Sequence, residues 1–220
     1  METLRGGYGN ELEIVQRDIL KMGELSIQAL HKSVEALVEL DLPKAEQVLV
    51  EDWAINQLET DIEQHCVLMI ARQQPLARDL RLLMTGLKIT TDLERIGDYA
   101  CDIAEMVRRI MPRKAHIKPL VDIPKMAVKA QEMVQDALKA YHDRDLALAQ
   151  KTFKDDDVVD QYYRKIYDEI LTMVDNQPVS AADAFYLIQA AKCLERVADH
   201  ATNIAEWVVY LETGERVRAN

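Results

Sequence analysis

The chain of 220 residues is poor in aromatic residues and glycine. Aromatic side chains make up 5% of the residues, whereas hydrophobic residues as a whole make up 49%. An aliphatic core of this kind suits helices packed on helices better than sheets, which favour aromatic and β-branched side chains. Glycine is absent between Asp98 and Thr213, so few turns that require a positive φ are expected there. The two shortages together predict long helices.

Cysteine and long apolar runs are also scarce. Cys66, Cys101 and Cys193 lie far apart, and an odd number of distant cysteines argues against a disulfide framework and fits a reducing compartment. No run approaches the ~20 apolar residues of a membrane span, and the N-terminus has no apolar signal core. We therefore expect a cytoplasmic protein without direct membrane insertion.

Basic residues are outnumbered, and the formal net charge is −11. The two halves of the chain are similarly acidic, and neither carries the basic stripe that a phosphate backbone requires. Binding to nucleic acid and electrostatic attachment to anionic lipid are therefore not expected.

Prolines and polar turns divide the sequence into six helical stretches. The predicted helices cover about 10–40, 43–72, 76–111, 125–141, 146–175 and 181 onward. Asp41 and Asp145 are suited to cap the second and fifth helices, and Ser180 with Asp183 resembles a capping box for the sixth. GGYGN near the N-terminus is interpreted as a flexible tail, and MPRKAHIKPLVDIP, with three prolines, as a linker.

The two halves of the chain repeat each other. ERIGDYACDIAEMV (Glu94–Val107) aligns without gaps on ERVADHATNIAEWV (Glu195–Val208), with eight of fourteen positions identical. QQP at 73–75 and NQP at 176–178 mark matching corners. The duplication predicts an all-α fold of two tandem antiparallel three-helix bundles, with domains at 1–115 and 116–220.

The third helix of each half carries a row of acidic side chains on one face. The rows consist of Glu94, Asp98, Asp102 and Glu105, and of Glu195, Asp199, Asn203 and Glu206. A solvated face on an acidic protein is the simplest interpretation. Like charges at i,i+4 nevertheless destabilise a helix by about 0.2–0.5 kcal/mol per pair, and a shared cation is one remedy for a row that occurs twice.

Helices two and five offer more oxygen ligands at matching places. Asp52 and Asn56 lie on the second helix, and Asp156 and Asp160 on the fifth. Hard divalent cations such as Mg²⁺, Mn²⁺ and Ca²⁺, or iron bridged by carboxylates, suit an oxygen-rich set without cysteine or histidine.

Signatures of enzymes are absent. No histidine follows a glutamate by three residues, as a ferritin-like di-iron site requires, and no HExxH motif or P-loop occurs. A metal-dependent enzyme or storage protein is therefore the weaker alternative, and no organic cofactor is expected. His200 stands where the first repeat has Tyr99, and we interpret it as structural.

Two segments resemble the PhoU family. LKITTDLERIGDYACDIAE (Leu87–Glu105), preceded by QQPLARDLR (Gln73–Arg81), is similar to the first half-signature of that family, and CLERVADHATNIAEWVVYLETGE (Cys193–Glu215) to the second. The resemblance extends over essentially the whole chain. It implies two three-helix bundles, often dimeric, whose E(D)xxxD motifs hold metal ions or multinuclear clusters.

Position by position, the resemblance implies eight metal ligands and leaves the ion open among Fe, Mn, Mg, Zn and Ca. These ligands are Asp52, Glu94, Asp98, Asp102, Asp156, Asp160, Glu195 and Asp199. Asn56 replaces an aspartate of the family pattern, and Asn203 stands opposite Asp102, so the two sites are expected to differ in charge and affinity.

The role that the resemblance implies is regulatory. It predicts a homodimeric adaptor that acts as a negative regulator of the phosphate regulon. The adaptor would link the ATPase subunit of the Pst phosphate ABC transporter to a PhoR-type histidine kinase. A metal-binding PhoU-like paralogue that serves another transporter is the alternative.

Overall fold

The computed structural model describes residues 2–111, 122–176 and 179–218. Regular structure in these residues consists of six α-helices without a strand, as the aliphatic composition and the scarcity of glycine predict. The helices are α1 (Glu2–Glu39), α2 (Leu42–Gln73), α3 (Ala77–Ile110), α4 (Asp122–Asp143), α5 (Leu146–Asp175) and α6 (Ala181–Thr213). The fold class predicted from the duplication is confirmed.

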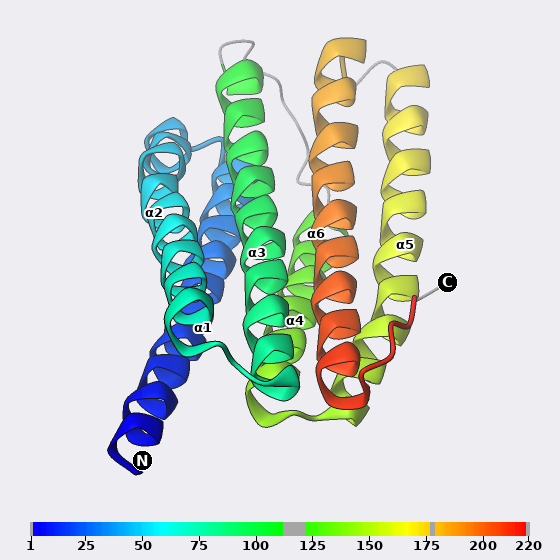
Figure 1. Cartoon of the computed structure of the whole chain (residues 1–220). Coiled ribbons are helices and arrows are strands. Elements are labelled where there is room, and N and C mark those ends of the chain that lie inside the picture. The colour runs from blue at the N-terminus through cyan, green and yellow to red at the C-terminus, as the bar shows by residue number, and fades with distance from the viewer. Residues whose placement is uncertain (1, 112–121, 177–178, 219–220) are drawn as a thin grey trace.

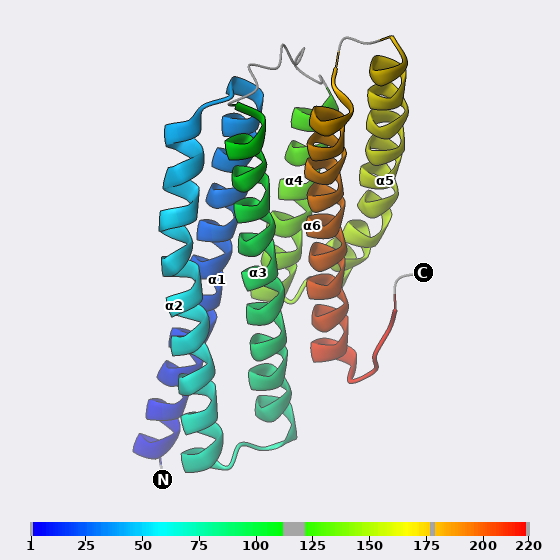
Figure 2. The same cartoon turned by 90° about the horizontal axis from the view of Figure 1, so that it is seen from above.

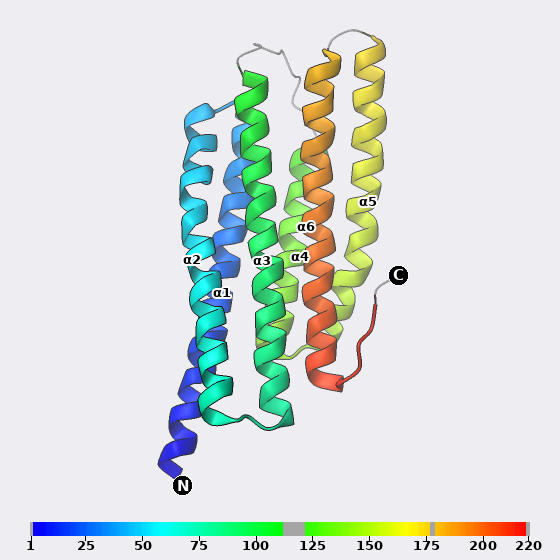
Figure 3. The same cartoon turned by 45° about the horizontal axis from the view of Figure 1, so that its top comes forward.

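The helices form two antiparallel bundles that lie side by side (Figure 1). α1, α2 and α3 pack on one another, as do α4, α5 and α6. The repeats meet mainly where α3 packs against α6 and, less closely, where α1 packs against α4. α2 and α5 therefore occupy the two outer edges of the molecule, as the turned views also show (Figures 2 and 3).

Predicted capping residues begin three of the helices. Asp41 Oδ1 accepts a hydrogen bond from the Lys44 amide at 3.0 Å, and Asp145 Oδ1 accepts from two amides at the start of α5. Ser180 Oγ accepts from the Asp183 amide at 3.1 Å, which confirms the capping prediction for α6. Each side chain satisfies amides that have no partner within the helix.

Turns between the helices use few glycines. Leu40, Gln74 and Arg144 adopt φ values of 54°, 46° and 58° at the ends of α1, α2 and α4, and Gly214 adopts 77° after α6. The left-handed conformation lets the chain leave a helix while its last carbonyls still accept hydrogen bonds. Three of these turns thus tolerate a side chain where glycine is the common residue.

The N-terminal prediction is wrong. α1 begins at Glu2 and includes GGYGN, which was expected to be a flexible tail before a helix starting near Asn10. A glycine weakens a helix by about 1 kcal/mol relative to alanine but keeps its backbone hydrogen bond. A helix already formed downstream can therefore extend through it.

The predicted linker and domain boundary remain largely untested. Residues 112–121 of the linker, and with them the boundary between 115 and 116, lie outside the described residues. The last part of the predicted linker is helical, because α4 begins at Asp122. None of the helices in the described part of the chain is long and apolar enough to span a bilayer.

The core follows the apolar stripes of the helices. On α3 the apolar side chains are buried, including Ile89, Leu93 and Ile96, and on α6 the equivalent Leu194 and Val197 are buried too. Removing each such side chain from water contributes about 1.5–3 kcal/mol. Burial of these stripes fixes the rotation of α3 and α6, and with it the direction in which their acidic rows point.

Candidate metal centre

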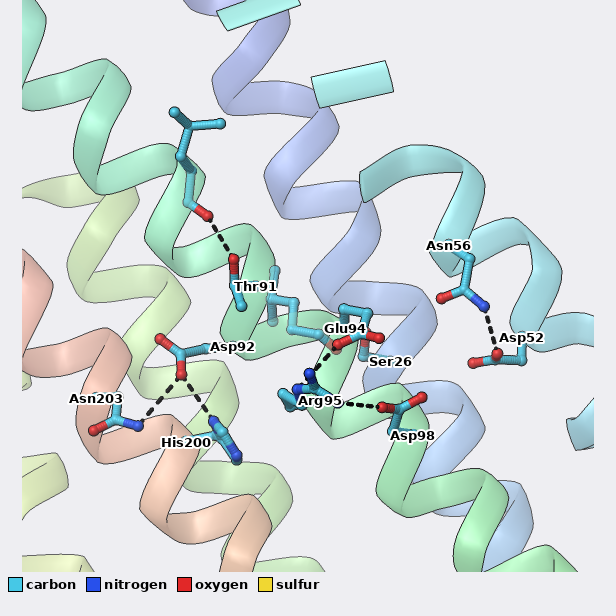
Figure 4. A network of polar contacts seen from close by, with 12 residues as sticks. Ser26, Asp52, Asn56, Thr91, Asp92, Glu94, Arg95, Asp98, His200 and Asn203 are labelled. Carbon is cyan, nitrogen blue, oxygen red and sulfur yellow. Dashed lines mark hydrogen bonds and ion pairs between the residues drawn. The ribbon is translucent and has the colours of Figure 1, made fainter. Parts of the chain in front are cut away.

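On α3, an arginine of the same helix lies beside the first two carboxylates of the acidic row. Glu94 is half-buried, and the Arg95 guanidinium lies 3.4 Å from its carboxylate and 3.0 Å from Asp98 Oδ2 (Figure 4). Behind the row, the Ser26 hydroxyl lies 3.1 Å from the Leu93 carbonyl oxygen and ties α1 to α3. A single arginine therefore serves the first two carboxylates of the row.

α2 brings Asp52 onto the backbone of α3. A Cβ placed on Gly97 would lie 3.2 Å from Asp52 Oδ1 and 3.1 Å from the Ile55 side chain, so the absence of a side chain permits this close approach. The Asn56 amide donates to Asp52 Oδ2 at 2.8 Å (Figure 4). Burial, followed by the nearby Asp52, raises the pKa of the Cys101 thiol to about 12. Asp52 thus faces α3.

Glu59 was not among the metal ligands predicted from the sequence. Burial first, then the neighbouring Glu63 and the more distant Asp98, raise the pKa of the Glu59 carboxyl, and Glu59 in turn raises that of Glu94. Glu59 follows Asp52 by seven residues, which places both on one face of α2. This heptad spacing was the available signal. The first repeat therefore gathers one more carboxylate than predicted.

Two carboxyl groups of the α3 row, those of Glu94 and Asp102, have raised pKa values. Burial and then Asp98 raise the pKa of Glu94, and Arg95 only partly offsets them. Burial, followed by the negative charges of Asp98 and Glu105, raises the pKa of Asp102. Repulsion between like charges disfavours the ionised forms. The row therefore carries negative charge that the surrounding side chains do not fully compensate.

In the second repeat, α5 and α6 bring four predicted ligands together. The pKa of Asp156 rises to about 6, mainly through burial and then through Asp199, Asp160, Asp157 and Glu195. Burial followed by Glu195 also raises the pKa of Asp199. The carboxylates of the two helices thus repel one another across the contact.

Basic side chains compensate the second repeat more fully than the first. The Lys192 ammonium lies 2.5 Å from Glu195, while Arg196 lies 3.2 Å from Asp199. Arg164 pairs with Asp160 at 3.1 Å. The first repeat has Thr91 at the position of Lys192, and its hydroxyl donates to the Leu87 carbonyl instead. A lysine therefore already occupies the side of Glu195 where a cation would be attracted.

A polar cluster at the α3–α6 contact was not predicted. The buried Asp92 carboxylate lies 2.8 Å from His200 Nδ1 and accepts from the Asn203 amide at 3.3 Å (Figure 4). The rings of Tyr99 and His200, which occupy equivalent positions in the two repeats, lie 5.7 Å apart. Asp92 lies on the apolar side of α3, which was the signal that it needed a partner. His200 thus has the structural role expected of it.

The chemistry of these residues fits a hard cation, but a complete site is not preformed. Oxygen donors from two helices face each other in each repeat, and burial followed by like charge raises the pKa values of Glu94, Asp102, Asp156 and Asp199 among them. No group of three or more His, Cys, Asp or Glu side chains in the described ranges is arranged to hold a metal ion. Binding would require carboxylates to turn from their basic partners, so the eight predicted ligands stay a prediction.

Comparison with known proteins identifies relatives over nearly the full length. The PhoU domain matches the chain twice, at residues 19–107 and 123–208. A phosphate-specific transport system accessory protein PhoU homolog of Clostridium acetobutylicum is 35% identical, over 97% of each chain. One of Pseudomonas aeruginosa is 37% identical, over 96% of this chain and 87% of the relative.

Solved structures are similar as well. The crystal structure of PhoU from Pseudomonas aeruginosa has a TM-score of 0.89 and 36% identity, and the match covers 94% of this chain and all of that one. The phosphate transport system regulatory protein PhoU from Streptococcus pneumoniae has a TM-score of 0.88 and 31% identity, with 96% and 99% covered.

Proposed function

The chain belongs to the PhoU family, and from this premise we propose that it is an accessory regulator of phosphate transport. Its finer role in this proposal is that of a cytoplasmic adaptor that represses the phosphate regulon when phosphate is plentiful. The observation that carries the proposal is the match of both repeats, along nearly the whole chain, to relatives named as accessory proteins of the phosphate-specific transport system.

The adaptor contacts two partners in this proposal, the ATPase subunit of a phosphate ABC transporter and a PhoR-type histidine kinase. An adaptor acts by docking and needs no catalytic group. The raised pKa values of the three cysteines, about 11 for Cys66 and about 12 for Cys101 and Cys193, keep these thiols protonated and poorly nucleophilic. This agrees with a role in binding rather than in turnover.

Deletion of the gene tests the regulatory role. Expression of a phosphate-regulon reporter in phosphate-rich medium should rise in the deletion strain and return to its repressed level when the gene is restored. Unchanged expression would count against the proposal. A change confined to the genes of a different transporter would instead identify a paralogue.

A pull-down with the tagged chain tests the partners. Cells grown in high and in low phosphate are compared, and the captured proteins are identified by mass spectrometry. The transporter ATPase and the kinase should be enriched in high phosphate relative to a strain with the untagged chain. Capture of neither protein under either condition would contradict the docking proposal.

We also propose that the acidic rows bind divalent cations or iron. Burial and then repulsion from neighbouring carboxylates raise the pKa values of Glu94, Asp102 and Asp156. Support comes from the repulsive part, because a cation between carboxylates relieves such repulsion. The bound ion would supply positive charge, and the carboxylates would hold and orient it.

Metal analysis of the purified chain tests the rows directly. The protein is equilibrated with Mn²⁺, Mg²⁺, Zn²⁺ or Fe²⁺, and bound metal is measured by mass spectrometry. Glu94→Ala and Glu195→Ala should each lower the metal content, whereas Glu24→Ala, at an exposed site on α1, should not. Equal metal content in all variants would rule out the proposed metal sites and would leave the regulatory proposal unaffected.

A further inference from the structure

The corner between α2 and α3 lies at one end of the molecule and exposes large apolar side chains (Figures 1 and 3). Leu76, immediately before the first turn of α3, is 79% exposed. Four more exposed apolar residues belong to the last turns of α2 and the first turns of α3, namely Val67, Leu68, Leu80 and Met84. Exposed apolar residues that occur singly are common, but their accumulation at one corner is typical of an interaction surface.

The same corner is basic, although the chain as a whole is acidic. Residues 67–84, which we call the basic corner, contain three arginines and one acidic residue, Asp79. The arginines are Arg72, Arg78 and Arg81, and none of them forms an ion pair within the described part of the chain. Their positive charge is therefore available to an anionic partner.

The three arginines occupy different places in the basic corner. Arg72 and Arg78 are exposed and flank Leu76 in the sequence. Nε of Arg81 is buried without a hydrogen-bond partner, and a Cβ placed on Gly214 would collide with its guanidinium. Arg81 is therefore fixed against the turn that follows α6, while the other two side chains can turn toward a partner.

The equivalent corner of the second repeat has the opposite charge. Residues 170–187, which we call the acidic corner, contain Asp175 and Asp183 but no basic residue. Leu171 and Phe185 are exposed there, so both corners share the apolar character. The two corners lie at opposite ends of the molecule (Figures 1 and 3). Positive charge beside exposed apolar side chains thus distinguishes the first corner from the second.

We propose that the basic corner rests on the surface of an anionic lipid bilayer. Leu76 enters the headgroup region, and Arg72 and Arg78 lie beside lipid phosphates. The proposal goes beyond the regulatory function and does not depend on it. The acidity of both halves of the chain was the reason to expect no attachment to anionic lipid, and the basic corner departs from that average.

The shape of the corner favours a bilayer over a protein partner. A partner helix binds its apolar side chains in a groove, whereas the turn between α2 and α3 lies at the tip of a helical hairpin (Figure 3). At the interface of a bilayer, an apolar side chain can enter the acyl boundary while arginine side chains extend toward the phosphates. An exposed leucine between two exposed arginines suits this environment.

The expected affinity is low and depends on salt. Each arginine near an anionic surface strengthens binding about five-fold. Asp79 and the net charge of −11 oppose this attraction, although charges farther than about 10 Å from the lipid are largely screened at 0.1 M salt. A contact of this strength orients a protein at a membrane without anchoring it.

Co-sedimentation of the full chain with vesicles tests the proposal. Vesicles of phosphatidylglycerol and phosphatidylcholine in equal parts, at millimolar lipid and low ionic strength, should bind the chain. Phosphatidylcholine alone should not bind it, and salt at about 0.5 M should release it. No binding to the anionic vesicles, or equal binding to both kinds, would overturn the proposal.

Removal of single charges locates the contact. Arg72→Gln and Arg78→Gln should each weaken binding about five-fold, and the double variant about 25-fold. Arg109→Gln removes the same charge from an exposed site in the last turn of α3, at the other end of that helix, and should leave binding unchanged. Circular dichroism confirms that each variant is folded. An equal loss for Arg109→Gln, or no loss for Arg78→Gln, would contradict the proposed contact.

A tryptophan at the turn reports insertion. The fluorescence that Leu76→Trp adds to that of the wild type should shift to shorter wavelength on anionic vesicles and be quenched by brominated acyl chains. Leu171→Trp, in the acidic corner, is the matched control and should show neither effect. Quenching at residue 171, or none at residue 76, would show that the basic corner does not enter the lipid.

Other occupants of the basic corner would be recognised with the same variants. Retention of the wild type, but not of Arg78→Gln, on immobilised polyglutamate without binding to vesicles would identify an acidic protein segment as the partner. Self-association that both Arg78→Gln and Asp175→Asn abolish would show that basic and acidic corners bind each other. Either result would overturn the lipid proposal.

Discussion

Replacing Asp156 by asparagine should stabilise the metal-free protein above pH 6. The wild-type carboxyl has a pKa of about 6 instead of 3.8, because it is partly buried and lies near Asp199 and Asp160. The folded state therefore binds this proton more tightly than the unfolded state does. The contribution of this carboxyl to wild-type stability becomes less favourable as pH rises from about 4 to about 6, and its full penalty is present above that range.

The size of the effect follows from the shift in pKa. A rise from 3.8 to about 6 would correspond to about 3 kcal/mol at most. Solvent screens this half-buried carboxyl, so we expect a gain of about 1–1.5 kcal/mol from Asp156→Asn at pH 7.5. The gain should shrink as the pH falls from 6 toward 4, because the wild-type carboxyl is then protonated in the folded state and increasingly protonated in the unfolded state.

Urea unfolding followed by circular dichroism measures the gain between pH 4 and 8. The protein is treated with a chelator first, and Asp168→Asn, an exposed site on the same helix, serves as the control. A gain that is constant with pH, or a loss of stability above pH 6, would refute the electrostatic reasoning. Adding Mn²⁺ should stabilise the wild type more than Asp156→Asn if the row binds the ion.

Three further changes test other parts of the structure. Asp41→Ala removes the cap on the Lys44 amide and should lower the free energy of unfolding by about 1 kcal/mol in urea titrations; no loss would mean that another group caps α2. His200→Leu leaves buried Asp92 with Asn203 alone and should cost about 2–3 kcal/mol, whereas the double variant with Asp92→Leu should recover most of it in the same assay. Lys192→Thr removes the nearer of two basic partners of Glu195 and should tighten Mn²⁺ binding in calorimetry at least several-fold; unchanged affinity would show that the lysine does not compete with the ion.

The sequence was sufficient to predict the fold because its separate signals agreed with one another. Prolines and polar turns, capping residues and the duplicated segment all indicated the same six helices, and the predicted caps Asp41, Asp145 and Ser180 make the expected hydrogen bonds. The start of α1 was missed because glycines weaken a helix without ending it. Propensity alone could not reveal that a long downstream helix continues through them.

The sequence predicted which helices carry the candidate site, but not which side chains pair with its carboxylates. Spacing placed Glu94 and Asp98 on one face, and pairing of α2 with α3 brought Asp52 to that face. Whether a carboxylate meets another carboxylate or a lysine depends on rotamers and helix packing, which a single sequence does not determine. Asp92 was overlooked for this reason, since its partner His200 lies on another helix. Lys192 is three residues before Glu195 on the same helix, a spacing that the sequence already contains.

The acidic positions of α3 and α6 differ where the two helices touch. At positions 101 residues apart, the acids beside the outer helices are kept, as in Glu94 and Glu195. Those at the α3–α6 contact differ, and Asn203, the counterpart of Asp102, donates to Asp92. The counterpart of Asp92 is Cys193, whose pKa burial and then Asp102 raise to about 12. In a contact between two identical repeats, the same residue would have to fit both sides of the contact. In a duplicated chain, the residue on each side can change independently. In the acidic row of α6, an amide that donates to the first repeat therefore stands where the row of α3 has a carboxylate. The larger set of carboxylates that could bind a cation lies on α2 and α3.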